Sequence, residues 1–427
     1  MKILIKNAHI IDPSQDIDGL FDLLIDDTKI SGIYPRGKSP KIKLDKTIDA
    51  TNLYLLPGLI DIHTHLREPG FENKETIKTG TFAAIRGGFT SVASMPNTSP
   101  VNDSPGITEF IIQKAEKEGF CSVFPIGAIT KGQNGEELTE MDLMIKAGCV
   151  AFSDDGRPVE KSIIMRRALE YSKAFGVPII SHCEDLSLSE GGVMNEGLLA
   201  HTLGLRGIPK AAEEIIVYRD IALAELTGGR LHIAHVSTSG SVRLIRQAKE
   251  RGIRVTAETC PHYFSITEEA VSNYNTDAKV NPPLRTEKDI EAIKDALRDG
   301  TIDVIATDHA PHTEGEKAGE FDSAPFGISG LETALPLSLK LVEENTLTLK
   351  ELTKKLTINP ASIIGIDKGT LKIGSDADII LVDLNKNFKV SRKNFVSKGK
   401  NTPFEGYSLR GSVVITISRG RIYEWQD

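Results

Sequence analysis

From residue 57 onward, short apolar runs rich in β-branched residues alternate with longer stretches in which apolar residues recur about every 3.6 positions. This alternation is typical of βαβ units that build a parallel sheet. Helices are predicted at 162–175, 212–226 and 286–300, the last beginning at a threonine cap and closing on glycine. The eight predicted strands cover residues 58–65, 88–95, 121–129, 149–155, 177–183, 230–237, 253–260 and 302–309.

The two ends of the chain follow a different pattern. Residues 1–56 and those from about 369 alternate as strands do, with no helical stretches between them. We therefore predict an α/β fold: a TIM-type (β/α)8 barrel over 57–365, with a small composite β-sandwich domain formed by 1–56 and 366–427. Two long connections, 184–210 and 310–330, follow barrel strands, and the second is a candidate lid.

Composition narrows the classes of function. The chain has 427 residues, enough for a barrel of about 250 residues and a second domain. Its net charge of −8 comes without a basic stripe, which argues against a nucleic-acid partner. No run of eighteen apolar residues indicates a membrane span, and the start, MKILIKNAHIIDPS, lacks a secretory signal. We expect a cytoplasmic protein with a small-molecule ligand.

The four cysteines are far apart, and each lies in an apolar, strand-like stretch: Cys121, Cys149, Cys183 and Cys260. No CxxC pair occurs. Buried free thiols are therefore favoured over a disulfide framework.

The first candidate site is His63-Thr64-His65 at the end of the first barrel strand. Residues i and i+2 of a strand face the same side, so both imidazoles can bind one metal ion. Taken alone, the pair fits an ordinary polar strand end equally well.

Other strand ends carry the same kinds of side chain. Because parallel barrel strands end at one mouth, these groups converge on one point. They are Asp154 and Asp155 on the fourth strand, His182 on the fifth, His235 on the sixth, and Asp308 on the eighth.

Nitrogen and oxygen ligands of this kind favour Zn²⁺ over Ca²⁺ or Mg²⁺. Four histidines and two aspartates exceed the needs of one tetrahedral ion, so two ions are favoured and one is the minimum. Zinc lowers the pKa of a bound water towards neutrality, and Asp308 is the candidate that takes and returns its proton. By strand alternation we assign His232 a packing role, and His309 a supporting role beside the ligands.

At this point the residues resemble the amidohydrolase superfamily and, within it, the dihydroorotases of the long bacterial type. The resemblance covers nearly the whole chain. The motifs that carry it are GLIDIHTHLREPG (58–70), SMPNTSP (94–100), FSDDGRPV (152–159), SHCED (181–185), IAHVST (233–238), CPHYF (260–264), KVNPPLR (279–285), ATDHAPH (306–312), PFGISGLET (325–333) and GTLKIGSDADIILVD (369–383).

The resemblance implies a role for each matching position. His63 and His65 would bind one ion, His182 and His235 the other, and Asp155 would bridge them, with Asp308 touching the metal and acting as general acid/base. The substrate would be dihydroorotate. Its contacts would be His65, Arg67, Asn97 and His312, the last three around the ring carboxylate, with Asn281, Phe326 and Gly327 around the ring.

One absence discriminates within the superfamily. Hydantoinases, allantoinases and the shorter dihydroorotases resemble one another in using a carboxylated lysine from the fourth strand as the bridge. FSDDGRP has no lysine; Lys146 precedes the strand and Lys161 follows it. An aspartate must therefore bridge, and alternation favours Asp155 over Asp154.

The expected function is the reversible, zinc-dependent cyclisation of N-carbamoyl-L-aspartate to L-dihydroorotate in pyrimidine biosynthesis. The alternatives are a related hydantoinase or allantoinase and a catalytically silent partner subunit of aspartate transcarbamoylase. For Arg67, the alternative to a substrate contact is a salt bridge at the rim. We also expect a homo-oligomer that can associate with aspartate transcarbamoylase.

Overall fold

The computed structural model describes residues 1–425, and its centre is a parallel eight-stranded barrel. A bridge between Thr64 and His309 brings the first and last strands together, so the barrel is nearly closed. Each predicted strand is present but shorter than expected, and the predicted fold class is confirmed. In spatial order the strands are β15 (Val304–Ile305), β14 (Val255–Thr259), β13 (Leu231–Ile233), β10 (Ile179–Ser181), β9 (Ala151–Ser153), β8 (Ser122–Gly127), β7 (Phe89–Ser94) and β6 (Leu59–Thr64).

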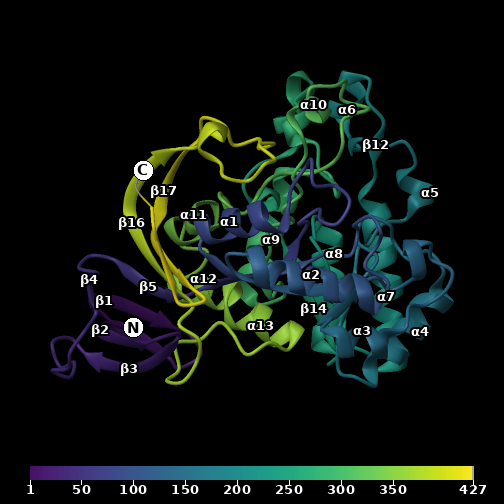
Figure 1. Ribbon diagram of the computed structural model, residues 1–427. Coiled ribbons are helices and arrows are strands. Elements are labelled where there is room, and N and C mark those ends of the chain that lie inside the picture. The colour runs from purple at the N-terminus through teal and green to yellow at the C-terminus, as the bar shows by residue number, and fades with distance from the viewer. Residues whose placement is uncertain (426–427) are drawn as a thin grey trace.

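Helices surround the barrel, and the three that the sequence predicted are among them (Figure 1). Thr76 and Thr286 form capping boxes that satisfy the first amides of α1 and α9. The helices are α1 (Ile77–Arg86), α2 (Pro105–Glu118), α3 (Met141–Ala147), α4 (Ser162–Lys173), α7 (Lys210–Thr227), α8 (Ser239–Glu250), α9 (Glu287–Asp299), α11 (Ala334–Glu343), α12 (Leu349–Leu356) and α13 (Ile358–Ile364).

Two apolar layers follow from strand alternation. The barrel interior is a cluster of small and branched residues that includes Ile60, Ile126, Ile180 and Val304, each from a different strand. Residues on the opposite strand faces, such as Leu59, pack in a second cluster with the helices. Burial on both faces explains why these strands read as continuous apolar runs. The interior is thus a packed core, and the open end of the barrel carries the polar residues.

The two ends of the chain form one mixed sheet, seen in Figure 1 as the purple and yellow strands lying side by side. Its order is β18-β17-β16-β5-β1-β2-β3, with β4 parallel to β1. Both ends of the chain contribute to this β domain, as expected. Its description as a β-sandwich and its exact bounds stay predictions, and residues 426–427 lie outside the described part. The strands are β1 (Lys2–Asp12), β2 (Ile17–Asp26), β3 (Lys29–Pro35), β4 (Lys46–Asp49), β5 (Tyr54–Pro57), β16 (Ile379–Lys389), β17 (Ser408–Ser418) and β18 (Arg421–Glu424).

The long connections carry small elements of their own. The first holds α5 (Leu186–Ser189), β11 (Met194–Asn195), α6 (Leu198–Leu203) and β12 (Gly207–Ile208), with β11 and β12 paired in parallel. The second holds α10 (Glu314–Lys317). Short 3₁₀ turns lie at Lys131–Gln133, Pro261–Phe264, Glu268–Tyr274, Thr276–Ala278 and Arg392–Asn394.

Two expectations about the whole chain can be checked against the described residues. All four cysteines are free and buried, as predicted. Among residues 1–425, no helix combines the length and the apolarity that crossing a membrane would require.

Candidate metal centre

The first two imidazoles come from the end of β6, where the strand departs from regular pairing. The register between β6 and β7 shifts between Asp61 and Thr64, an irregularity of the kind that redirects side chains beside active sites. The buried Asp61 carboxylate accepts hydrogen bonds from the amides of His63 and Thr307, at 3.0 and 3.2 Å. The first strand end is thereby fixed to the residues just before Asp308.

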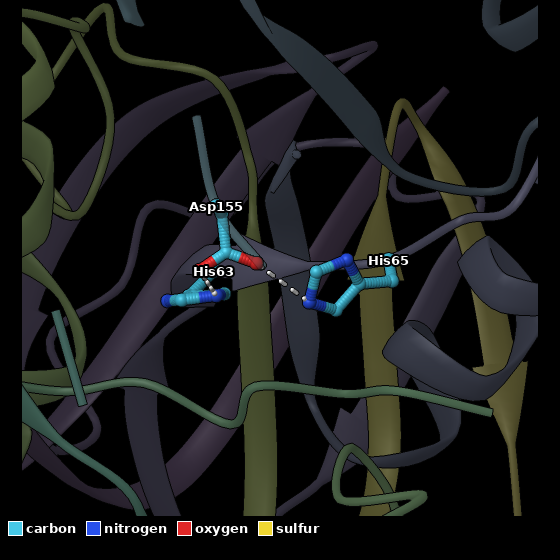
Figure 2. Close-up of side chains that lie close together, drawn as sticks. All are labelled: His63, His65 and Asp155. Atoms are coloured by element: carbon cyan, nitrogen blue, oxygen red, sulfur yellow. Dashed lines mark ion pairs between the residues drawn. The ribbon is translucent and has the colours of Figure 1, made fainter. Parts of the chain in front are cut away.

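Asp155 lies between the two imidazoles of β6 (Figure 2). Its Oδ1 is 3.4 Å from Nε2 of His63, and its Oδ2 is 3.4 Å from Nε2 of His65. The three side chains are buried, and their ligand atoms lie within 4.8 Å of one another. They form one cluster suited to a divalent cation.

Asp155 also belongs to a second cluster, with His182 and His235. Oδ1 of Asp155 is 3.4 Å from Nδ1 of His182 and 3.4 Å from Nε2 of His235. The two ring nitrogens are themselves 2.8 Å apart. The shared carboxylate therefore joins two buried clusters of potential metal ligands, the arrangement of a binuclear site.

Asp308 reaches the first cluster from the end of β15. Its Oδ1 is 3.0 Å from Nε2 of His65 and 3.5 Å from Nε2 of His63. Burial would raise the pKa of Asp308, but His63 and His65 outweigh it and lower the pKa below its usual value. Asp308 is therefore an ionised carboxylate at the edge of the first cluster.

Acceptors on the far side of the imidazoles set which nitrogen faces the centre. Nδ1 of His63 donates to Glu258 at 2.5 Å, and Nδ1 of His65 donates to Asn97 at 2.8 Å. Nε2 of His182 donates to Glu184 at 3.0 Å. With a metal ion bound, the remaining nitrogen of each ring would present its lone pair to the ion, as metal ligation requires.

The buried nitrogen and oxygen atoms of the clusters are better satisfied by a cation than by hydrogen bonds to one another. Nε2 of His63 and Oδ1 of Asp155 are buried, and neither has a hydrogen-bond partner among the described residues. Burial would lower the pKa of His63, yet the carboxylates of Asp155, Glu258 and Asp308 raise it well above its usual value. The same concentration of negative charge favours a divalent cation between these donor atoms.

The structure separates the two aspartates of the fourth strand as alternation suggested. Asp154 turns away from the clusters and accepts hydrogen bonds from the amides of Ile129 and Thr130, at 2.8 and 3.1 Å. Burial raises the pKa of Asp154 to about 6. Asp155 is the residue that meets the histidines.

His232 is not the packing residue that alternation suggested. Nε2 of His232 lies 3.2 Å from Glu258, and Nδ1 lies 2.8 Å from Thr256. The error arises because β13 ends at Ile233 and His235 has a φ of 35°, so regular alternation does not extend between the two histidines. His309, by contrast, stays outside the clusters: its Nδ1 accepts from the Gly330 amide at 3.2 Å.

Two residues at the centre were missed in the sequence. Glu258 lies on β14, fully buried, and bonds both His63 and His232. Glu184 follows β10 and accepts from Nε2 of His182 and from Nδ2 of Asn281, at 3.0 and 2.9 Å. A lone glutamate within an apolar strand, where an unpaired charge is costly, was the available signal for Glu258.

A cavity of about 340 Å³ opens over the two clusters. It brings together every residue for which the resemblance implied a substrate contact. These lining residues are His65, Arg67, Asn97, Asn281, His312, Phe326 and Gly327. Asp155, His182, His235 and Asp308 also reach it, whereas His63 lies fully buried beneath.

Arg67 and His312 face each other on one side of this cavity. Arg67 donates from Nε to the Pro311 carbonyl at 3.3 Å, and burial lowers its pKa to about 10. Nε2 of His312 donates to the Phe326 carbonyl at 2.8 Å, so Nδ1 accepts from Lys74 at 3.3 Å. Within residues 1–425 no carboxylate forms an ion pair with Arg67.

Comparison with known proteins places the chain in a family. The model of the amidohydrolase family matches residues 54–423. Dihydroorotases from Syntrophus aciditrophicus, Acetivibrio thermocellus and Geobacter metallireducens are 53%, 54% and 55% identical to the chain. The matches cover 100%, 98% and 99% of this chain, and the same shares of those proteins. The chain belongs to the dihydroorotases of the amidohydrolase family.

Solved structures share the fold of this dihydroorotase family member at lower identity. An L-hydantoinase (dihydropyrimidinase) from Arthrobacter aurescens has a TM-score of 0.88 and 26% identity, over 98% of this chain and 95% of that one. A dihydropyrimidinase from Brevibacillus agri has a TM-score of 0.84 and 26% identity, covering 99% and 95%. In the described part of this dihydroorotase family member, no lysine lines the cavity, and Asp155 joins the two clusters.

Proposed function

We propose that the chain catalyses the reversible cyclisation of N-carbamoyl-L-aspartate to L-dihydroorotate, with two zinc ions held by His63, His65, Asp155, His182 and His235. The observation that carries this proposal is the guanidinium of Arg67, which lines the cavity beside the clusters without a carboxylate partner. Both substrates carry a carboxylate, and a guanidinium binds that group in a bidentate manner.

The neighbours of Arg67 support an anionic ligand at this place. Lys74, which pairs with Glu316 at 2.9 Å, lies 3.3 Å from His312, and burial together with Arg67, Lys74 and Lys317 lowers the pKa of His312 to about 2. A neutral His312 carries no charge of its own to satisfy Arg67. An incoming carboxylate would supply the ion-pair partner that Arg67 lacks.

Zinc ions, when bound, supply Lewis acidity to a carbonyl oxygen and lower the pKa of a water molecule. Asp308 performs the proton transfer: it takes a proton from the attacking water and delivers it to the ring nitrogen that leaves. Its carboxylate suits both tasks because it is ionised and lines the cavity beside His65. In ring closure the same group removes the proton from the attacking nitrogen.

Hydrolysis of another cyclic amide is the nearest alternative, and it is favoured by the structural likeness to hydantoinases. Hydantoin and allantoin lack the ring carboxylate that Arg67 would bind. The test is turnover by the metal-loaded protein of dihydroorotate, hydantoin and allantoin side by side. We expect turnover of dihydroorotate to exceed the others; hydantoin turnover without dihydroorotate turnover would overturn the proposal. No turnover of any of the three would favour a silent partner subunit.

We also infer that the chain forms a homo-oligomer and can associate with aspartate transcarbamoylase. One face of α7 exposes three apolar side chains, which supports a contact with another protein chain at that face. They are Ile215, Tyr218 and Leu226. Light scattering of the purified protein, alone and mixed with the transcarbamoylase, tests both inferences. A monomer that ignores the transcarbamoylase would contradict them. Zinc as the metal and a cytoplasmic location likewise stay predictions.

A further inference from the structure

A segment from the C-terminal part of the chain, residues 397–402, packs against the two loops that form one side of the cavity. Both belong to the 310–330 connection: the first loop, before α10, contains Ala310 and His312, and the second, after α10, contains Gly327. Asn401 is the residue of the segment that bonds both loops, and it is 3% exposed. No feature of the sequence pattern had linked this position to the site.

The Asn401 side chain uses its full hydrogen-bonding capacity on these loops. Its Nδ2 donates to the carbonyls of Ala310 and Gly327, at 3.1 and 2.9 Å. Its Oδ1 accepts from the His312 amide at 3.0 Å and from the Ser329 hydroxyl at 2.8 Å. One planar amide therefore sets the spacing between the two loops.

Gly399 allows the segment to approach this closely. A Cβ atom at Gly399 would lie 2.3 Å from Cβ of Pro311 and 2.9 Å from the amide nitrogen of His312. Even the smallest side chain would thus push on the backbone that carries His312. The contact is independent of the Asn401 hydrogen bonds, yet it acts on the same loop.

We propose that Asn401 is a positioning residue for substrate binding, which holds His312 and Gly327 at the spacing that the dihydroorotate ring requires. It touches neither substrate nor metal and acts through the two loops. The donors matter most, because only an amide can donate to two carbonyls and accept from two donors in one plane. This inference rests on the proposed function.

Loss of the Asn401 contacts should affect substrate binding, but not metal binding or the chemical step. The Asn401 side chain bonds Ala310, His312, Gly327 and Ser329, and none of these belongs to the two clusters, so the clusters should bind metal as before. His312 and Gly327, by contrast, lie on the side of the cavity that we assign to the substrate. Displacing these loops should raise KM far more than it lowers kcat.

The experiment compares Asn401→Asp with the parent protein, both loaded with zinc. The aspartate keeps the shape and the acceptors but places a carboxylate oxygen against the carbonyls of Ala310 and Gly327. We expect KM for dihydroorotate to rise at least tenfold, with kcat within about threefold and the zinc content unchanged. Asn387→Asp, the same exchange at an exposed position on β16, is the matched control and should leave KM unchanged.

Gly399→Ala provides a second test that leaves the hydrogen-bonding groups intact. It should also raise KM selectively, which keeps the inference testable if Asn401→Asp fails to fold. An unchanged KM in either folded variant, or an equal loss of kcat and zinc, would overturn the positioning role. If the parent protein itself does not turn over dihydroorotate, the proposed function fails instead, so the two failures are distinguishable.

Discussion

Glu258 accepts a hydrogen bond from Nδ1 of His63 at 2.5 Å, and this contact decides which nitrogen of His63 faces the metal centre. The carboxylate is fully buried and also lies 3.2 Å from His232. Burial would raise the pKa of Glu258, but His63 and His232 outweigh it and lower the pKa, so the group stays ionised. Glu258 thus orients His63 and increases its basicity as a ligand.

Replacing Glu258 with Gln should weaken metal binding at the first cluster. The amide keeps the shape but loses the charge, and loss of a partner of this kind costs roughly 10- to 100-fold in metal affinity. Competition with a chelating dye measures this affinity directly. Glu116→Gln, an exposed exchange on α2, serves as the control. Equal affinities in the Glu258 variant and the parent would show that the contact does not tune the ligand.

Asp308→Asn should abolish proton transfer while leaving metal bound. The side-chain oxygen that remains can still face the first cluster, but an amide cannot take and return a proton. We expect kcat to fall by at least about 100-fold, with both ions retained in metal analysis. If the variant keeps substantial turnover, Asp308 is not the acid/base group.

Arg67→Met should weaken substrate binding without disturbing the metal clusters. Methionine fills part of the volume of the side chain, so the main loss is the charged partner of the substrate carboxylate. We expect KM for dihydroorotate to rise by about 100-fold, because removing one member of a buried charge pair costs 2–5 kcal/mol. Arg67→Lys should recover only part of the loss, since a lysine cannot bind bidentately. An unchanged KM in Arg67→Met would contradict the assignment.

The low pKa of His312, about 2, predicts how stability responds to pH. Unfolded histidine titrates near 6.5, so between pH 6.5 and 2 the unfolded chain binds a proton that the folded chain excludes. Stability from this group is therefore present above pH 6.5 and is lost as the pH falls.

His312→Gln should remove this part of the acid sensitivity. When the pH is lowered from 7.5 to 5, the unfolding free energy of the parent should fall by up to about 2 kcal/mol more than that of the variant. Urea denaturation at the two pH values measures it. Parallel losses in both proteins would mean that His312 is protonated in the folded state.

Much of the fold could be predicted because each barrel strand is short, apolar and buried on both faces. Runs such as 177–183 and 302–309 therefore stand out against the helical stretches between them. Convergence at the barrel mouth follows from the fold itself, which is why the ligand-bearing strand ends could be grouped without coordinates. The absence of a lysine near 152–158 also correctly pointed to an aspartate between the clusters.

The roles of some site residues could not be predicted from the sequence, because they depend on local backbone geometry or on contacts with distant segments. His232 was misassigned because alternation does not hold past the end of β13. Asn401 was missed because its role depends on a contact between residues nearly ninety positions apart, and no periodicity encodes such a pairing. Glu258 carried a signal, a lone acid in an apolar strand, but its partner His63 is on a strand far away in the sequence.

The most direct test of the central claim is a zinc titration of the metal-free protein, followed by dihydroorotate turnover and bound metal in the same samples. We predict no turnover without metal, and activity that rises with bound zinc up to two ions for each chain. Dihydroorotate turnover by the metal-free protein, or a zinc-loaded protein that binds two ions and leaves dihydroorotate unchanged, would contradict the account.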